Sequence, residues 1–92
     1  MLSYEWDAAK AASNRAKHGV RFSEAAGVFE DPNAAIEPDD HADEERYVIV
    51  GLDAAGRLLV LVFTWRGEDV VRLISARKAT REEVGIYNEE RR

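Results

Sequence analysis

The chain has 92 residues, no cysteine and a formal net charge of −5. This length predicts a single domain spanning residues 1–92, and the lack of cysteine excludes disulfide bonds and thiolate metal sites. No apolar stretch approaches the roughly 20 residues of a membrane-spanning helix, and the N-terminus does not resemble a secretory signal. We therefore expect a cytoplasmic protein with no membrane partner.

The charge is distributed unevenly along the sequence. Residues 30–45 contain eight acidic side chains and no Lys or Arg, whereas residues 57–81 contain six Lys and Arg against two acidic residues. This segregation would allow one face of the domain to meet phosphate groups even though the net charge is negative.

The N-terminal third predicts a strand and a helix. Residues 2–6 alternate aromatic and polar side chains, which is typical of a short strand. Asp7 is a suitable N-cap, and His18-Gly19 is a suitable C-terminus, for the helix that follows. A stripe of small residues at helical spacing predicts the face that approaches a sheet: Ala8, Ala9, Ala12 and Ala16.

A second, shorter helix is predicted after Gly19. Ser23 is its expected N-cap, Asp31-Pro32 should end it, and its apolar positions follow at i, i+3, i+4 and i+7: Phe22, Ala25, Ala26 and Phe29. These aromatic residues, with Tyr4 and Trp6, are expected in the core. Residues 31–44 are acidic, contain two prolines and lack periodicity, so we expect a loop there.

The C-terminal half predicts three strands and a helix. A strand over residues 45–52 leads through a turn at residues 53–56 into the apolar run 58–63, which returns after Gly67 as a strand over residues 70–76. Thr80 and Glu83 match a capping box for a last helix over residues 81–90. The expected fold is α+β, with an antiparallel β-sheet meander, two N-terminal helices and one C-terminal helix.

Few residues suit metal or nucleophilic chemistry. The two histidines, His18 and His41, fall in different predicted elements, and no metal-binding, nucleophile-elbow or phosphate-loop motif occurs. We expect no metal and no cofactor. The arginines of the central hairpin remain as the candidate functional residues, because a guanidinium pairs with a phosphate through two hydrogen bonds and stays charged. The alternative is that these arginines only protect strand edges and confer solubility.

Three other positions allow two interpretations each. His18, next to Lys17, could transfer a proton near a ribose hydroxyl or could simply complement a helix C-terminus. Glu45 could be a general base or form a surface pair with Arg46. Trp65 follows the apolar run beside Arg66, and an exposed indole there would offer a stacking surface to a base or a partner.

Two blocks of residues resemble the BrnT family of bacterial type II toxins. The first block contains Tyr4-Glu5-Trp6-Asp7, Lys10, Asn14 and Lys17-His18-Gly19-Val20, and the second runs from Arg72 to Thr80 as RLISARKAT. Further matches are Glu45-Arg46, Gly56-Arg57 and Arg66-Gly67. The resemblance implies a ribonuclease with a RelE-like fold that inhibits translation. It also implies a BrnA-like antitoxin with a ribbon-helix-helix part, through which the pair would bind operator DNA.

The resemblance also assigns roles to residues of this chain. Arg66 and Arg77 are expected to grip the phosphoryl oxygens together, with Lys17, His18 and Glu45 as further catalytic candidates. The RNA backbone would be held by Arg46, Arg57, Arg72 and Lys78. Trp65 is a stacking candidate because of its position beside Arg66, not because of the resemblance. We expect the ribose 2′-oxygen to attack the neighbouring phosphorus without a metal. The competing hypothesis is a non-catalytic or inactivated toxin-like module that docks an antitoxin.

Overall fold

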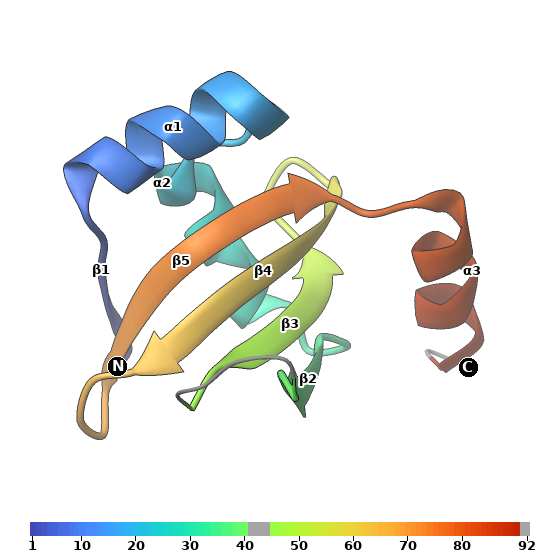
Figure 1. The fold of residues 1–92 in the computed structure, drawn as a ribbon. Helices are drawn as coiled ribbons and strands as arrows, with labels where there is room; N and C mark the ends of the chain where they lie inside the picture. Colours follow the sequence, from blue (N-terminus) through green and yellow to red (C-terminus); the bar gives the residue numbers. More distant parts are fainter. Residues whose placement is uncertain (41–44, 91–92) are drawn as a thin grey trace.

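The computed structural model describes residues 1–40 and 45–90 of the chain. Five strands form one sheet in the order β1-β5-β4-β3-β2, with helices on both sides (Figure 1). Along the chain the elements are β1 (Ser3–Glu5), α1 (Ala8–His18), α2 (Phe22–Ala25), the 3₁₀ helix η1 (Ala26–Glu30), β2 (Ala35–Pro38), β3 (Tyr47–Leu52), β4 (Leu58–Trp65), β5 (Val70–Lys78) and α3 (Arg81–Glu90). None of the helices in this part of the chain is long and apolar enough to cross a membrane.

The sheet is mixed, which corrects the expected antiparallel meander. Strands β2 to β5 do pair antiparallel with their neighbours, but β1 pairs parallel with β5, with Glu5 opposite Arg72. The chain reaches β5 from β1 through α1, α2, η1 and the other three strands, so the two are not joined by a hairpin. The α+β class is confirmed.

Helix α1 has the predicted ends but not the predicted packing. The Asp7 side chain accepts hydrogen bonds from the amides of Ala9 and Lys10, and Gly19 adopts the left-handed conformation at the C-terminus. The alanine stripe predicted to face the sheet is exposed to solvent. Ala11 and Asn14 lie on the packed face instead, because Asn14 makes hydrogen bonds that no alanine can replace.

Asn14 bonds to the edge of β5 beyond the point where β1 ends. Its side-chain amide donates to the carbonyl of Ala76 at 2.9 Å and accepts from the Ala76 amide at 3.0 Å, as a neighbouring strand would. It also donates to the Val20 carbonyl. One buried side chain therefore joins α1, the following turn and the sheet.

Two further expectations between residues 22 and 44 are corrected. The second helix begins after Arg21, without a side-chain cap, so Ser23 is not its N-cap. It tightens into η1 after Ala25, because Val28 as well as Phe22 is drawn into the core. The predicted loop contains the edge strand β2, which pairs with β3, and its residues 41–44 lie outside the described part of the chain.

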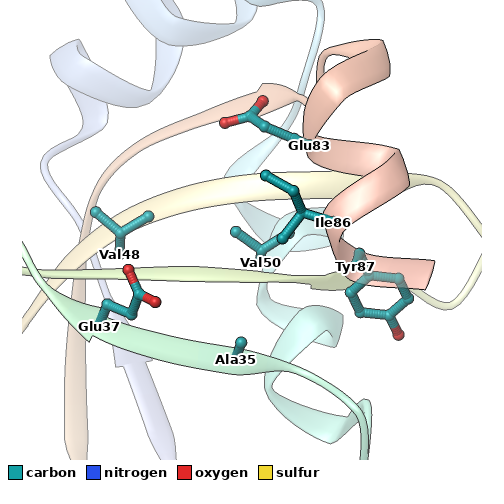
Figure 2. Close-up of a pocket in the computed structure, with 7 residues that line it drawn as sticks. All are labelled: Ala35, Glu37, Val48, Val50, Glu83, Ile86 and Tyr87. Carbon is teal, nitrogen blue, oxygen red and sulfur yellow. The ribbon is translucent and has the colours of Figure 1, made fainter. Parts of the chain in front are cut away.

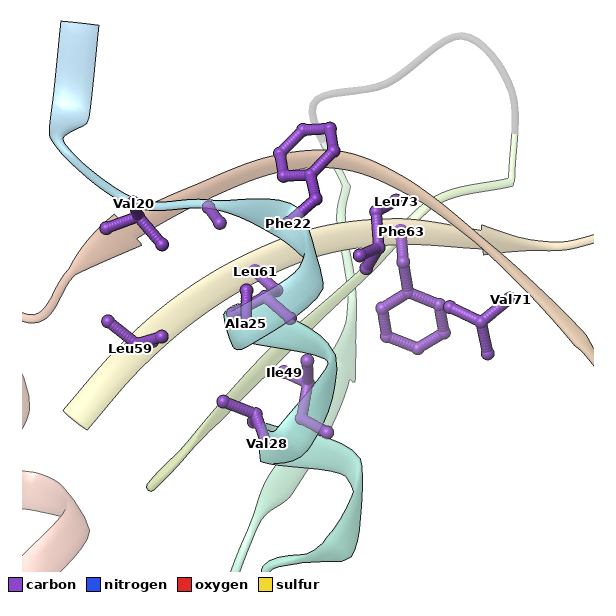
Figure 3. Close-up of a cluster of buried hydrophobic side chains, with 11 residues drawn as sticks. Val20, Phe22, Ala25, Val28, Ile49, Leu59, Leu61, Phe63, Val71 and Leu73 are labelled. Atoms are coloured by element: carbon purple, nitrogen blue, oxygen red, sulfur yellow. The ribbon is translucent and has the colours of Figure 1, made fainter. Parts of the chain in front are cut away.

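The hydrophobic core lies between the sheet and the helices α1, α2 and η1. Figure 3 shows α2 and η1 crossing β4, with Phe22, Ala25 and Val28 directed at the strands. The sheet residues of this inner face are Ile49, Leu59, Leu61, Phe63, Val71, Leu73 and Ala76. The predicted aromatic residues contribute, since Phe22 is buried and Tyr4, Trp6 and Phe29 pack against the core.

The opposite, outer face of the sheet follows from strand alternation. It carries Glu5, Arg72, Thr64, Val62, Val60, Val48, Val50 and Arg77, whose strand partners are one another. The register of β4 and β5 shifts between Val62 and Phe63, so that Ile74 has no partner in β4. This extra residue places Arg72 and Arg77 on the same face, although residues five apart in a regular strand face opposite ways.

Helix α3 leans over one end of the outer face. The capping box is confirmed, since Glu83 accepts from the Thr80 amide and Thr80 accepts from the Glu83 amide. Tyr87 donates a 2.5 Å hydrogen bond to Asp31. A groove of about 280 Å³ separates α3 from β2 and β3 (Figure 2), and its lining is mostly apolar: Ala35, Glu37, Val48, Val50, Glu83, Ile86 and Tyr87.

Candidate functional site

Polar side chains form a row across the outer face at the end of the sheet nearest the β4–β5 turn. Glu5 of β1 lies opposite Arg72 of β5, which lies opposite Thr64 of β4. Continuing the antiparallel register of β3 and β4 by one residue places Arg46 beside Thr64. Arg66 follows two residues after Thr64 and shares its face. Four strands thus bring three arginines, a hydroxyl and a carboxylate to one row, named here the arginine row.

Two guanidiniums of the arginine row converge on one oxygen atom. Arg66 Nε and Arg72 Nη1 each lie 3.5 Å from Glu5 Oε1. The Arg66 side chain is 62% exposed and that of Arg72 34%. A guanidinium has five N–H donors, so each keeps donors for a ligand. An anion placed here would meet two permanent positive charges held by a hairpin.

Arg77 lies apart from this convergence. It is five residues from Arg72 along β5, which corresponds to roughly 16 Å. Its guanidinium forms two parallel hydrogen bonds with Glu83, at 2.8 and 2.9 Å. In this conformation Arg66 and Arg77 do not meet at one phosphate, which corrects that expectation. The hairpin guanidiniums that the structure brings together at one atom are those of Arg66 and Arg72.

The Arg77–Glu83 pair is electrostatically strong. The hydrogen bonds from Arg77 lower the pKa of Glu83 from 4.5 to about 2, against the opposing effect of burial, and the Thr80 amide adds to the lowering. The same contact raises the pKa of Arg77. Because both carboxylate oxygens of Glu83 accept hydrogen bonds, this pair holds α3 to the end of β5.

Lys17 and His18 lie at the C-terminal end of α1, beside the edge of β5 that α1 covers. They border a shallow depression with Lys10, Ile74 and Ser75. Ile74 and Ser75 lie between Arg72 and Arg77 along β5, so this depression is midway between the two arginines. Neither residue belongs to the arginine row.

Glu45 lies two residues before the start of β3, near the same end of the sheet as the arginine row. The Thr64 hydroxyl donates a 2.7 Å hydrogen bond to the Glu45 backbone carbonyl. This bond fixes the segment that carries Glu45 and Arg46 against β4. The Glu45 side chain is exposed, whereas Arg46 is partly buried.

Arg57, Lys78 and Trp65 lie away from the arginine row. Arg57 forms hydrogen bonds with the buried Asp53 at the β3–β4 turn, with Nε 2.9 Å from Oδ2. Burial raises the pKa of Asp53, but the backbone and side-chain hydrogen bonds from Arg57 outweigh it and the pKa is lowered. Lys78 pairs with Leu59 of the inner face. Trp65 is 38% exposed and packs edge-on against Phe63.

Two members of the arginine row were not predicted as site residues. Glu5 sits between two aromatic residues in the sequence, and that alternation does indicate that it faces away from the core. Its proximity to Arg72 depends on the parallel β1–β5 pairing, which the sequence did not predict. Thr64, two residues before Arg66, also matches the BrnT family pattern, but no site role was predicted for it. Within residues 1–40 and 45–90, no three His, Asp or Glu side chains are grouped to hold a metal ion.

Comparisons with known proteins were made by family model, sequence and structure. The model described as the ribonuclease toxin BrnT of the type II toxin–antitoxin system matches residues 6–83. The fold is similar to the crystal structure of the Brucella abortus ribonuclease toxin BrnT, with a TM-score of 0.70 and 23% sequence identity. That alignment covers 88% of this chain and 100% of the Brucella chain. No curated protein matches the sequence.

Proposed function

Because the chain belongs to the BrnT family of ribonuclease toxins of type II toxin–antitoxin systems, we propose that it cleaves RNA on the outer face of its sheet. The observation that carries this proposal is the convergence of Arg66 and Arg72 on Glu5 Oε1. Two guanidiniums fixed on a hairpin can bind the same phosphodiester and stabilise the extra charge of its pentacoordinate transition state. Toxicity then follows from the loss of translatable RNA in the cytoplasm.

The reaction we propose needs no metal. The ribose 2′-oxygen attacks the adjacent phosphorus in line, and the bond to the 5′-oxygen breaks. The products are a 2′,3′-cyclic phosphate and a 5′-hydroxyl. Arg66 and Arg72 position the phosphate and compensate its charge, which are the main contributions that a protein can make to phosphoryl transfer of this kind.

The other basic residues are assigned to binding along the RNA chain. Arg46 extends the arginine row toward β3, where a neighbouring phosphate would lie. Arg77 is positioned for a more distant phosphate and would exchange its contact with Glu83 for the RNA. Lys17 and His18, at the β5 edge, and Lys78, the last residue of β5, would contact RNA that leaves the outer face. Arg57 and Trp65 are the weakest candidates, since Arg57 is paired with Asp53 and Trp65 belongs to the inner face.

The partner we propose is a BrnA-like antitoxin with a ribbon-helix-helix part, through which the complex would bind operator DNA. A toxin of a type II system is neutralised by a protein, so an antitoxin is expected from the family alone. The finer identity of this antitoxin rests on the sequence resemblance.

The experiment that tests the proposal is RNA cleavage by the purified protein in EDTA. We expect cleavage with cyclic phosphate and 5′-hydroxyl ends, and a loss of about 10²–10³-fold in rate for Arg72→Ala. Arg15→Ala is the matched control, because Arg15 is exposed on α1 outside the site. Fragments with 5′-phosphate ends, or activity that EDTA abolishes, would refute the metal-independent reaction.

A second candidate function is a binding module without catalysis. The apolar groove between α3 and the sheet favours it, since Ile86 is 49% exposed there and a partner segment could cover it. Expression in bacteria separates the two candidates. A ribonuclease stops growth and Arg72→Ala relieves the arrest, whereas a binding module leaves growth unaffected in both cases.

A further inference from the structure

Glu5 is the carboxylate at the centre of the arginine row. It ends β1, and its neighbours Tyr4 and Trp6 pack against the core, so its own side chain lies on the outer face. That side chain is 40% exposed. A substrate that approaches Arg66 and Arg72 therefore reaches Glu5 as well.

The contacts of Glu5 differ from those of Glu83, another carboxylate that pairs with an arginine on this face. Glu83 accepts hydrogen bonds on both oxygens, from Arg77 and from the Thr80 amide, at 2.8–2.9 Å. Glu5 is contacted on Oε1 alone, at 3.5 Å. Within the described part of the chain, no residue donates to Oε2. Glu5 thus retains a carboxylate oxygen able to accept a proton.

We propose that Glu5 is the general base of the RNA cleavage reaction, an inference that rests on the proposed function. Its carboxylate removes the proton from the ribose 2′-hydroxyl as the 2′-oxygen forms its bond to phosphorus. The bond from phosphorus to the 5′-oxygen breaks, and this oxygen takes a proton from water. Glu5 then releases its proton to solvent. Arg66 and Arg72 hold the phosphate next to the base, so positioning and proton transfer occur at one place.

Geometry favours Glu5 over the bases predicted from the sequence. His18 is the last residue of α1 and lies at the β5 edge, beside Ile74 and Ser75. Glu45 precedes β3, where its backbone carbonyl holds Thr64, and no arginine of the converging pair contacts it. Of these three candidate bases, Glu5 is the one in contact with both guanidiniums that would hold the phosphate.

The test compares single-turnover cleavage of an RNA oligonucleotide by the parent and by Glu5→Gln. We expect the rate constant to fall by about 10²–10⁴-fold, the usual contribution of a general base. RNA affinity should be unchanged or tighter, because a negative charge beside two arginines is removed. Glu68→Gln, in the adjacent β4–β5 turn, removes the same charge and should cleave at the parental rate.

Two further measurements distinguish a base from a structural carboxylate. The shape of the pH profile of cleavage should differ between the parent and Glu5→Gln, whereas loss of a carboxylate that only supports the structure should leave that shape unchanged. The charged groups around Glu5 are Arg66 and Arg72. Asp7 also lies near Arg72. The pKa of Asp7 is lowered mainly by hydrogen bonds from the Lys10 and Ala9 amides, and the charge of Arg72 adds a smaller effect. Formate added to Glu5→Ala should restore cleavage by replacing the missing carboxylate.

The outcomes separate the two proposals. A parent that cleaves RNA together with an equally active Glu5→Gln would overturn the role of Glu5 and leave the proposed function intact. A parent that cleaves no RNA would overturn both. If Glu5→Gln is unfolded by circular dichroism, Glu5→Ala is assayed instead, with and without formate. A folded Glu5→Ala variant whose cleavage formate does not restore would contradict the role of Glu5 as the base.

Discussion

Asn14 shows how much of the stability of this small domain can depend on one side chain. It is 7% exposed and makes three hydrogen bonds to backbone groups of Val20 and Ala76. Replacing it by alanine leaves the amide and carbonyl of Ala76 without partners at a covered sheet edge. Each lost bond of this kind costs about 1 kcal/mol, and a buried unsatisfied group costs more.

We therefore predict that Asn14→Ala lowers the unfolding free energy by about 2–4 kcal/mol. Urea denaturation followed by circular dichroism measures this as a lower midpoint at an unchanged slope. Asn88→Ala, at an exposed position of α3, should differ from the parent by less than about 0.5 kcal/mol. A midpoint for Asn14→Ala equal to that of Asn88→Ala would show that the amide does not secure β5.

Glu83 gives the stability a predictable dependence on pH. Its pKa in the folded protein is about 2, against an ordinary value of 4.5, so protonation favours the unfolded chain. The stabilisation is complete above pH 4.5 and is lost as the pH falls toward 2. Because the Arg77 side chain is 42% exposed, solvent screening limits the contribution to about 1 kcal/mol.

The prediction is that Glu83→Gln is less stable than the parent at pH 6 and nearly equal to it at pH 2. Urea unfolding at a series of pH values measures the difference. Glu82→Gln, in the same turn of α3 but without a partner in β5, should show no such convergence. A difference between Glu83→Gln and the parent that stays constant with pH would contradict the assignment.

At the scale of elements, the approach of η1 to β3 depends on Gly51. A Cβ atom at this position would lie 2.9 Å from both the Ala34 Cβ and the Val28 Cγ1 atoms, and 3.1 Å from Asp31 Oδ2. These distances are too short for carbon atoms in van der Waals contact. Any side chain at position 51 must push η1 and the start of β2 away from the sheet.

Gly51→Ala should accordingly lower the unfolding free energy by about 1–3 kcal/mol, the usual range for overpacking. Gly85→Ala serves as the control, because a Cβ in the middle of α3 meets nothing within 4 Å. That change should be neutral or stabilising by up to about 1 kcal/mol, since alanine favours a helix. Thermal unfolding of the two variants measures both effects, and equal melting temperatures would contradict the packing described for Gly51.

Elements with local signals were predicted correctly from the sequence, and those that depend on distant contacts were not. Asp7 and Gly19 bound α1, and Thr80 with Glu83 begins α3, because caps are made within a few residues. Strand β2 was missed, because Ala35–Pro38 becomes a strand only by pairing with β3. The alanines of α1 indicated the wrong face. The hydrogen bonds of the buried Asn14 to Val20 and Ala76 turn the asparagine face of the helix toward the sheet.

At the scale of the whole molecule, the site depends on two features that no local sequence pattern predicts. The parallel pairing of β1 with β5 brings Glu5 to Arg72 across almost the whole length of the chain. The register shift at Ile74 turns Arg77 to the same face as Arg72. The sequence indicated that the hairpin arginines were the candidate groups. It did not indicate that Arg72, rather than Arg77, accompanies Arg66.

The overall charge is compatible with this arrangement. The protein carries a net charge of −5, so long-range attraction to RNA is weak, and binding must come from local contacts of the arginine row. A surface with few converging cations suits a toxin whose activity is controlled by a protein partner.

The account therefore depends on Arg66 and Arg72 acting on one phosphate, which a double-mutant cycle measures most directly. Single-turnover cleavage in EDTA would be compared for the parent, Arg66→Ala, Arg72→Ala and the double variant. Since the two guanidiniums act as a unit, we predict that each single change costs about 10²–10³-fold and that the double variant is little slower than either. Fully multiplicative losses, or single variants that cleave at the parental rate, would contradict the account.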